Sequence, residues 1–334
     1  MMPTTLLLVA ALALGAAAPS RPEATPGDRQ EQVVVVVVGA AGTREYAAQF
    51  AEGADLWRQA CEQGSAKCLA IGLDEEEDSS DRVRVQAALT DEAKETTAAL
   101  WLVLIGHGTY DGRTAKFNLR GPDVSAEDLA GWLEPIPRPV AIINAASSSA
   151  PFLKRLSAPG RVVITATKSG FEQNYARFGR FLAEAIVEPQ ADLDKDGQTS
   201  LLEAFLTASH RVGEFYAAEG RLATEHALLD DNGDALGTPA DWFRGIRPVQ
   251  KASDDASLDG YRAHQLHLLY SDTEAQMPSD LRARRDLLEL DVKTLRDARA
   301  TMPEGEYFAK LEALLYEIAQ VYEQIDGPDQ ERRP

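Results

Sequence analysis

The stretch LWLVLIGHGTYDG at residues 100–112 begins with six apolar residues and then changes abruptly to Gly106-His107-Gly108. An apolar run without polar alternation is typical of a strand that is covered on both faces in a parallel sheet. Six consecutive valines at 33–38 form a second run of this kind. We therefore expect residues 100–105 to form a central strand, with His107 held between two glycines at its carboxyl end.

Three further short apolar segments, at 68–72, 140–143 and 161–166, complete a set of five expected strands. Helical patterns separate them, up to about residue 62 and near 82–97, 125–133 and 149–157. This alternation predicts a three-layer α/β fold with a mostly parallel sheet, which we place at residues 32–250. Gly39–Gly42 lacks the GxGxxG spacing, so the first strand does not indicate a dinucleotide site.

The composition indicates an acidic globular protein of two or three domains. The 334 residues include 34 Lys and Arg against 53 Asp and Glu, which gives a formal net charge of −19. Binding to nucleic acid or to an anionic membrane surface depends on positive charge. We therefore expect neither of these as a partner.

The amino-terminal region predicts export. Leu6 to Ala18 is an uncharged stretch of 13 residues, too short for the roughly 20 residues that span a bilayer as a helix. Small residues end it, so we interpret 1–18 as a signal peptide and 19–31 as a flexible leader. The protein would then be periplasmic, cell-surface or secreted, without a stable membrane span. Cys61 and Cys68 could pair after export or remain two free thiols.

Ligands of open α/β sheets bind beyond the carboxyl ends of the strands. Gly106-His107-Gly108 ends one expected strand, and residues 144–149, Asn-Ala-Ala-Ser-Ser-Ser, end the next. If these strands are neighbours, His107 and the serines stand side by side at one edge of the sheet. The serines could also cap the helix that follows them.

Residues 33–245 resemble the caspase-like cysteine peptidases of clan CD, including the legumain branch. The resemblance is carried by LWLVLIGHGTYDG at 100–112 and AIINAASSSAPFL at 141–153. It implies that His107 matches the catalytic histidine and Gly108 its partner glycine. Backbone N–H groups near the His-Gly pair and the nucleophile supply the oxyanion hole in that family.

The expected cysteine of that family falls at Ala146, or at Ser147 if the turn is shifted by one residue, and no cysteine follows Cys68. A thiol ionises far more readily than a serine hydroxyl, which needs a well-oriented base. We therefore expect a catalytically inactive relative that binds a protein or peptide, or serves as a scaffold. The alternative is a hydrolase with Ser147 as nucleophile and His107 as base.

Residues 192–203 fit the calcium-loop pattern D-x-D-x-D-G-x5-E at every defining position. The pattern predicts a Ca²⁺ site with the following ligands: Asp192, Asp194, Asp196, the carbonyl of Gln198, Ser200 through water, and Glu203. A second acidic loop has Asp230, Asn232, Asp234 and Asp241 at matching positions. Ala235 replaces its required glycine, so there a tight turn is the stronger expectation.

Residues 251–334 have no expected strand and predict a helical hairpin, with helices at about 279–300 and 303–325. We expect Ser279 to cap the first helix and Thr301 to form a capping box with Glu304. One face of the second helix is apolar: Phe308, Leu311, Leu315, Ile318 and Tyr322. This face could pack within the chain, bind a partner or associate with a second copy.

Overall fold

The structure, a computed structural model, describes residues 31–73, 79–254 and 256–326. The signal peptide expected at 1–18, nearly all of the leader and the acidic run at 74–78 lie outside these residues. None of the helices within the described residues is long and apolar enough to cross a membrane.

A seven-stranded sheet in the order β10-β9-β8-β7-β3-β1-β2 forms the centre of the molecule. Its strands are β1 (Val33–Val38), β2 (Lys67–Ile71), β3 (Leu100–Ile105), β7 (Val140–Asn144), β8 (Arg161–Thr165), β9 (Leu228–Asp230) and β10 (Thr238–Pro239). The first five are mutually parallel, and β9 and β10 complete one edge in antiparallel pairing. The five expected strands are thus confirmed.

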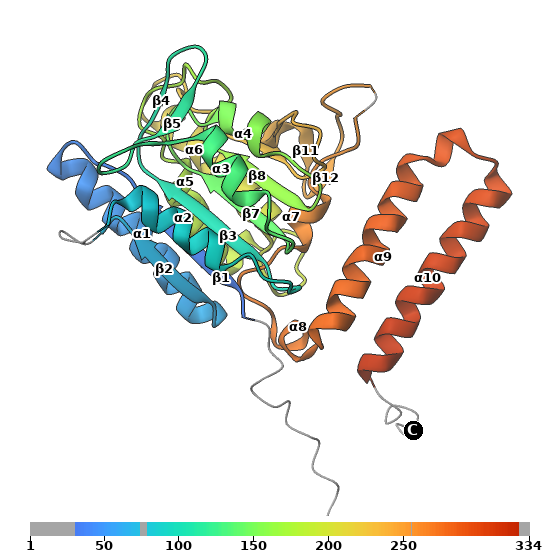
Figure 1. Cartoon of the computed structure of the whole chain (residues 1–334). Coiled ribbons are helices and arrows are strands. Elements are labelled where there is room, and N and C mark those ends of the chain that lie inside the picture. The colour runs from blue at the N-terminus through green and yellow to red at the C-terminus, as the bar shows by residue number, and fades with distance from the viewer. Residues whose placement is uncertain (1–30, 74–78, 255, 327–334) are drawn as a thin grey trace, which may run out of the picture.

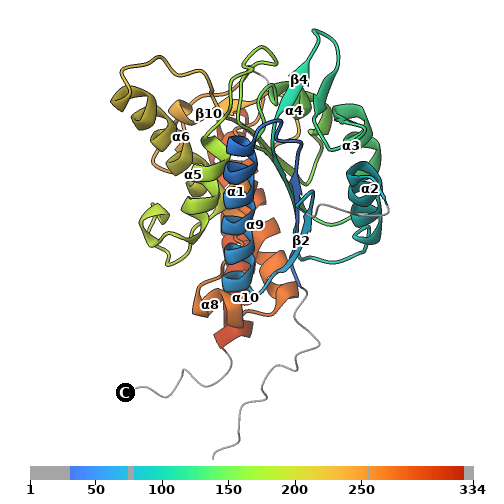
Figure 2. The same cartoon turned by 90° about the vertical axis from the view of Figure 1, so that its left-hand side faces the viewer.

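Helices cover both faces of this sheet. Figure 2 shows α1, α5 and α6 on one side and α2 and α3 on the other. The helices of the two layers are α1 (Arg44–Gly64), α5 (Phe178–Val187) and α6 (Leu201–Ala218), and α2 (Asp81–Asp91), α3 (Ala126–Leu133) and α4 (Ala150–Leu156). Alternate valines of β1 enter opposite cores: Val34 and Val36 pack with α1, α5 and α6, and Val35 with α2, α3 and α4. This arrangement confirms the expected three-layer α/β fold.

Smaller elements surround the sheet. Two short antiparallel sheets comprise β4 (Gly108–Tyr110), β5 (Ala115–Phe117) and β6 (Val124–Ser125), and β11 (Phe243–Arg244) with β12 (Arg247–Pro248). The short helices are η1 (Pro189–Ala191), η2 (Ala240–Trp242), α7 (Tyr261–Gln265), α8 (Asp272–Gln276) and η3 (Arg299–Thr301). Ala263 and Leu268, which follow residue 250, are buried in the same core as α1, α5 and α6.

The expected hairpin is present as α9 (Ser279–Asp297) and α10 (Glu304–Asp326), which run side by side beyond the domain (Figure 1). Its caps differ from the expectation. Ser279 is the first residue of α9 rather than its cap, and no side chain caps that helix. Thr301 belongs to η3, where its hydroxyl donates to the carbonyl of Ala298 at 2.7 Å.

The apolar face of α10 is only partly buried. Leu288, Val292 and Leu295 of α9 are buried, and α10 buries Tyr307 and Val321. Of the predicted stripe of α10, Leu311 and Ile318 are half-buried, whereas Phe308, Leu315 and Tyr322 are exposed. The apolar arc of α10 is therefore wider than the part that its one neighbouring helix covers.

Candidate functional site

His107 lies directly after β3, where residues of α1 enclose its ring. The ring centroid is 4.6 Å from that of Tyr46 and 5.1 Å from that of Phe50, both in edge-on geometry. Burial lowers the pKa of His107 below its usual value, although a contact with the carbonyl of Ala41 opposes the shift. Burial therefore favours the neutral form of the imidazole.

The pairing of β3 with β7 brings Ser147 beside Gly108, as expected from the sequence. The Ser147 hydroxyl accepts a hydrogen bond from the Gly108 N–H at 3.2 Å and donates to the Gly108 carbonyl at 3.3 Å. Its side chain is almost fully enclosed, since only 2% of Ser147 is exposed. Within the described part of the chain, this hydroxyl forms both of its hydrogen bonds with the backbone of Gly108 and none with His107.

Gly108 is required by the same close approach. A Cβ atom at this position would lie 2.2 Å from the carbonyl oxygen of Ser147, far inside van der Waals contact. Any side chain would force the two strand ends apart. The glycine therefore positions its own N–H against the serine.

The other members of the turn are also buried. The Ala146 N–H donates to the Asn144 side chain at 3.1 Å, and the Ser148 N–H donates to the carbonyl of Glu172 at 2.8 Å. Ser148 has a left-handed backbone with φ 55°. Ser149 occupies the cap position of α4, but its hydroxyl contacts Thr167 instead of capping the helix. The expectation of a serine cap is therefore wrong for this side chain.

A cavity of about 20 Å³ lies at the ends of β3 and β7. Its walls include Phe50 of α1, Ile105 of β3, Tyr175 from the segment before α5 and Gly179 of α5. A water molecule needs roughly 10–15 Å³ of such volume. This cavity is therefore large enough for a water molecule but too small for the side chain of a peptide substrate.

A larger hollow of about 320 Å³ opens farther along the same edge, beyond β8 and β9. Its walls are largely apolar, with charged groups among them; they include Lys168, Phe178, Val212, Glu225, His226, Leu228 and Asp241. Lys168 comes from the segment after β8. The remaining residues come from α5, from α6, from β9 and the approach to it, and from the segment after β10, which only the fold brings together.

Two acidic groups support the wall of this hollow. The Nδ1 atom of His226 lies 2.6 Å from a carboxylate oxygen of Glu172, whose other oxygen accepts from the Lys168 N–H at 3.0 Å. The Glu225 carboxylate accepts from the N–H groups of Arg177 and Phe178 at 2.7 and 2.9 Å, at the start of α5. Burial raises the pKa of Glu225.

The acidic loop before α6 brings its first three aspartates together, as the motif predicts. Ligand oxygens of Asp192, Asp194 and Asp196 all lie within 4.8 Å of one another. The Asp192 carboxylate accepts from the Lys195 N–H at 2.6 Å and from the Gly197 N–H at 3.1 Å. These bonds fold the loop around its carboxylates, and Gly197 supplies the left-handed turn with φ 93°.

The second half of this loop is fixed by the start of α6. Ser200 and Glu203 form a capping box, and one oxygen of Glu203 accepts from the Ser200 N–H at 2.8 Å. Its other oxygen accepts from the N–H groups of Leu193 and Asp194 at 2.7 and 3.1 Å. The Gln198 amide donates to Asp196 at 3.2 Å. The structure thus brings Asp192, Asp194 and Asp196 together, whereas both oxygens of the predicted ligand Glu203 accept from backbone N–H groups or from the Ser200 hydroxyl.

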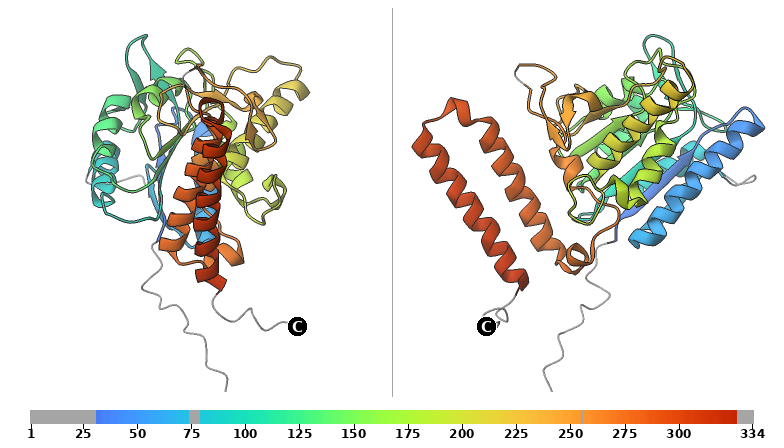
Figure 3. Two further views of the ribbon diagram at one scale, coloured as in Figure 1. Left: turned by 90° about the vertical axis from the view of Figure 1, so that its right-hand side faces the viewer. Right: turned by 180° about the vertical axis from the view of Figure 1, so that it is seen from behind.

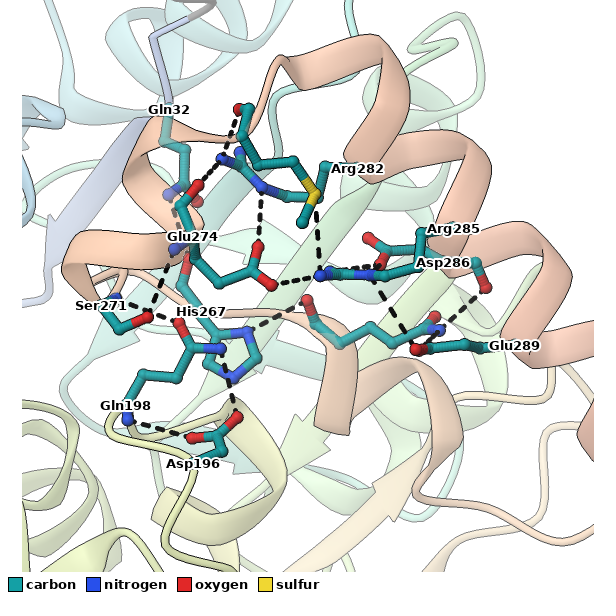
Figure 4. Close-up of polar contacts among 12 residues, drawn as sticks. Gln32, Asp196, Gln198, His267, Ser271, Glu274, Arg282, Arg285, Asp286 and Glu289 are labelled. Atoms are coloured by element: carbon teal, nitrogen blue, oxygen red, sulfur yellow. Dashed lines mark hydrogen bonds and ion pairs between the residues drawn. The ribbon is translucent and has the colours of Figure 1, made fainter. Parts of the chain in front are cut away.

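The segment that leads to the hairpin packs against this loop. His264 Nε2 lies 2.9 Å from an oxygen of Asp194, and the Ser271 N–H donates to the Gln198 side chain at 3.1 Å. Figure 4 shows Gln198 and Asp196 below Ser271 and His267. The loop is therefore connected with the carboxyl-terminal part of the chain, which no local motif in the sequence indicates.

The second acidic loop is a tight turn, as expected. The Asp230 carboxylate accepts from the N–H groups of Gly233 and Ala235, both at 3.0 Å. Within the described residues, only the first loop gathers three acidic, His or Cys ligands at metal-binding distances. Asp234 and Asp241 belong to no such group of ligands within the described residues.

The fold and the site together define an α/β protein with a histidine and a serine turn at the carboxyl edge of its sheet. No family model and no curated protein matches the chain. Two caspase structures are similar to it over 60% of its length. The Drosophila initiator caspase Dronc is 12% identical, with 79% of that chain covered and a TM-score of 0.43. Caspase-1 from Spodoptera frugiperda is 10% identical, with 86% covered and a TM-score of 0.41. At these identities the similarity concerns the fold alone.

Proposed function

We propose that this protein is an exported, catalytically inactive relative of the caspase-like peptidases that binds a protein or peptide. The observation that carries the proposal is the hydrogen bond from the Gly108 N–H to the Ser147 hydroxyl. By the sequence resemblance, this N–H would help to stabilise an oxyanion. Here it is bound within the protein, and alanine occupies position 146.

The alternative of a serine hydrolase has weaker support. A general base must lie within hydrogen-bond reach of the hydroxyl that it deprotonates. The Ser147 hydroxyl is bonded to the backbone of Gly108 at both its donor and an acceptor position, and it is buried. The His107 ring packs edge-on against the aromatic side chains of Tyr46 and Phe50.

The 320 Å³ hollow beyond β8 and β9 is a better candidate for the peptide-binding site than the small cavity at the ends of β3 and β7. Ligand sites of this size usually combine apolar walls with a few polar groups. The hollow has Phe178 and Leu228 on its walls together with Lys168 and Asp241. An apolar peptide side chain fits this chemistry, with the charged residues positioned to bind the peptide's polar groups.

A peptidase screen of the mature protein tests the loss of activity. We expect no cleavage by the wild type above the level of His107→Ala and Ser147→Ala, with all three melting alike within a few degrees. Cleavage that both substitutions abolish in folded protein would establish the hydrolase instead.

Binding is tested separately on an array of random peptides. We expect Ala240→Trp, at the wall of the hollow, to weaken peptide binding by about tenfold or more, because the indole fills the space. Ala217→Trp on the exposed face of α6 is the matched control and should retain binding. Equal binding by both variants would exclude the hollow as the peptide site.

We further infer that the loop at 192–203 binds Ca²⁺, on the support of its three convergent carboxylates. A ligand that binds only the folded state raises the melting temperature. We expect Ca²⁺ to raise it and a chelator to reverse the effect. Asp194→Asn combined with Asp196→Asn should remove this response, whereas Asp91→Asn at the end of α2 should retain it. A wild-type melting temperature indifferent to both reagents contradicts the inference.

A further inference from the structure

One flank of α10, beside the buried positions of the helix, carries an apolar stripe that is about half exposed. Phe308, Leu315 and Tyr322 are 50%, 49% and 42% exposed, although each is a large side chain. They follow one another at intervals of seven residues, which places them on one line of the helix. Tyr307 and Val321 each precede a residue of the stripe, so they lie about 100° from it round the helix, and both are buried. The apolar arc of α10 thus extends beyond its contact with α9.

The position of α10 makes this stripe accessible. Figures 1 and 3 show α10 as the outermost helix, with α9 between it and the α/β domain. A partner could therefore reach the stripe without displacing any element of the domain.

The charges on α10 are mainly negative. Between residues 304 and 324, α10 has five glutamates and one lysine, so 1 − 5 gives a net charge of −4. Lys310 pairs with Glu306 at 2.7 Å, and Arg284 of α9 pairs with Glu317 at 3.7 Å. The other glutamates have no recorded basic partner among the described residues; they are Glu304, Glu312 and Glu323. At 100° per residue Glu304 and Glu312 lie within about 60° of the centre of the stripe, and Glu323 lies about 80° from it.

We propose that this face of α10 binds an amphipathic helix of a protein partner whose apolar side is flanked by Lys or Arg. The partner helix would bury Phe308, Leu315 and Tyr322 and neutralise the adjacent glutamates, forming a three-helix arrangement with α9 and α10. A second copy of α10 would bring the same negative charge, which disfavours self-association on this face. This interaction is independent of whether the α/β domain hydrolyses peptides or binds them.

Synthetic helical peptides with a leucine seam test the proposal on the full chain. One peptide has lysines beside the seam, and the second has glutamates at the same positions. We expect the full chain to bind the lysine peptide at least about tenfold more tightly in fluorescence anisotropy. Combined Glu312→Lys and Glu323→Lys should reverse the order of the two peptides, because these residues set the sign of the face.

A triple variant locates the contact on the stripe. Combined Phe308→Ser, Leu315→Ser and Tyr322→Ser should weaken binding of the lysine peptide by about tenfold or more. The matched control combines Ala309→Ser, Ala313→Ser and Gln320→Ser on the opposite side of α10 and should change it less than about twofold. Circular dichroism of both variants checks that α10 remains helical.

Two results would overturn the proposal. Unchanged binding of the lysine peptide by the triple variant would mean that the acidic protein attracts cationic peptides without using the stripe. A wild-type dimer in sedimentation that the triple variant abolishes would mean that a second copy of the chain occupies this face.

Discussion

Buried carboxyl groups beside the sheet make single residues sensitive to pH. Asp259 accepts hydrogen bonds from the N–H groups of Asp231 and Asn232 and from the Thr238 hydroxyl. Asp231 in turn accepts from the N–H groups of Gly260 and Ala263. Burial, followed by the charge of Asp231, raises the pKa of Asp259 to about 8. The folded protein therefore retains a proton that the unfolded chain releases near its ordinary pKa.

We predict that Asp259→Asn reduces the loss of stability as the pH rises from acidic values to about 8. A carboxyl group with a raised folded-state pKa contributes stability that is fully present below its unfolded-state pKa, and this contribution is lost progressively until the pH has risen through the folded-state value. The wild type should lose on the order of 1–3 kcal/mol more than the variant between about pH 5 and about pH 9. Asparagine can accept the same two backbone N–H bonds, so the loop should retain its shape. Urea unfolding at several pH values measures the difference.

The exposed Asp254 provides the control for this prediction. Asp254→Asn should leave the pH dependence as in the wild type. Identical pH profiles for Asp259→Asn and the wild type would show that Asp259 ionises normally in the folded protein.

At the residue scale the sequence predicts neighbours better than it predicts hydrogen bonds. His107 and Ser147 were expected at one edge because parallel neighbouring strands end together, and the structure brings them there. The orientation of the Ser147 hydroxyl depends on the backbone of Gly108, so its bonding could not be foreseen. The contact of His226 with Glu172 joins residues 54 positions apart and has no local pattern.

At the scale of elements, burial on both faces made the strands predictable. Each parallel strand is a short apolar run, so its sequence differs plainly from that of the amphipathic helices. Helix ends were less predictable when a distant residue caps them. The first N–H groups of α5 bind Glu225, which lies far along the chain. The pattern of α10 likewise shows an apolar arc but not which part of that arc α9 covers.

The last turn of α1 and the strand β2 can be joined covalently. Cys61 of α1 and Cys68 of β2 are free thiols in the structure, and a hydrogen bond between the two thiols raises the pKa of Cys61 and lowers that of Cys68. We predict that export to an oxidising compartment converts them to a disulfide. The bond should add on the order of 2 kcal/mol of stability, because it closes a short loop in the unfolded chain.

Mass spectrometry of the exported protein, alkylated after unfolding, measures this pairing. The oxidised protein should lack two hydrogens and take up no alkylating reagent, whereas Cys68→Ser should take up one equivalent at Cys61. Two alkylated cysteines in wild-type protein recovered from such a compartment would refute the prediction.

At the scale of the whole molecule, α9 belongs to the α/β domain more closely than α10 does. Gln265 donates to the carbonyl of Asp286 at 2.8 Å, and Arg282 lies 4.1 Å from the ring centroid of Tyr270. Figure 4 shows Arg282 and Arg285 of α9 directed at Glu274. The same segment is held to the sheet by Gln32, whose side chain donates to the carbonyl of His267 at 3.0 Å.

The two helices of the hairpin should therefore contribute unequally to the stability of the domain. Ending the chain after Met302 removes α10, whose main contact is with α9, and should lower the melting temperature of the domain by only a few degrees. Ending it after Met277 also removes the partners of Gln265, Tyr270 and Glu274, and should lower it further because buried polar groups lose their hydrogen bonds. Val321→Asp, which detaches α10 without shortening the chain, should match the first truncation. Calorimetry of the three proteins measures these shifts, and an equal loss from both truncations would mean that α10 stabilises the domain as strongly as α9 does.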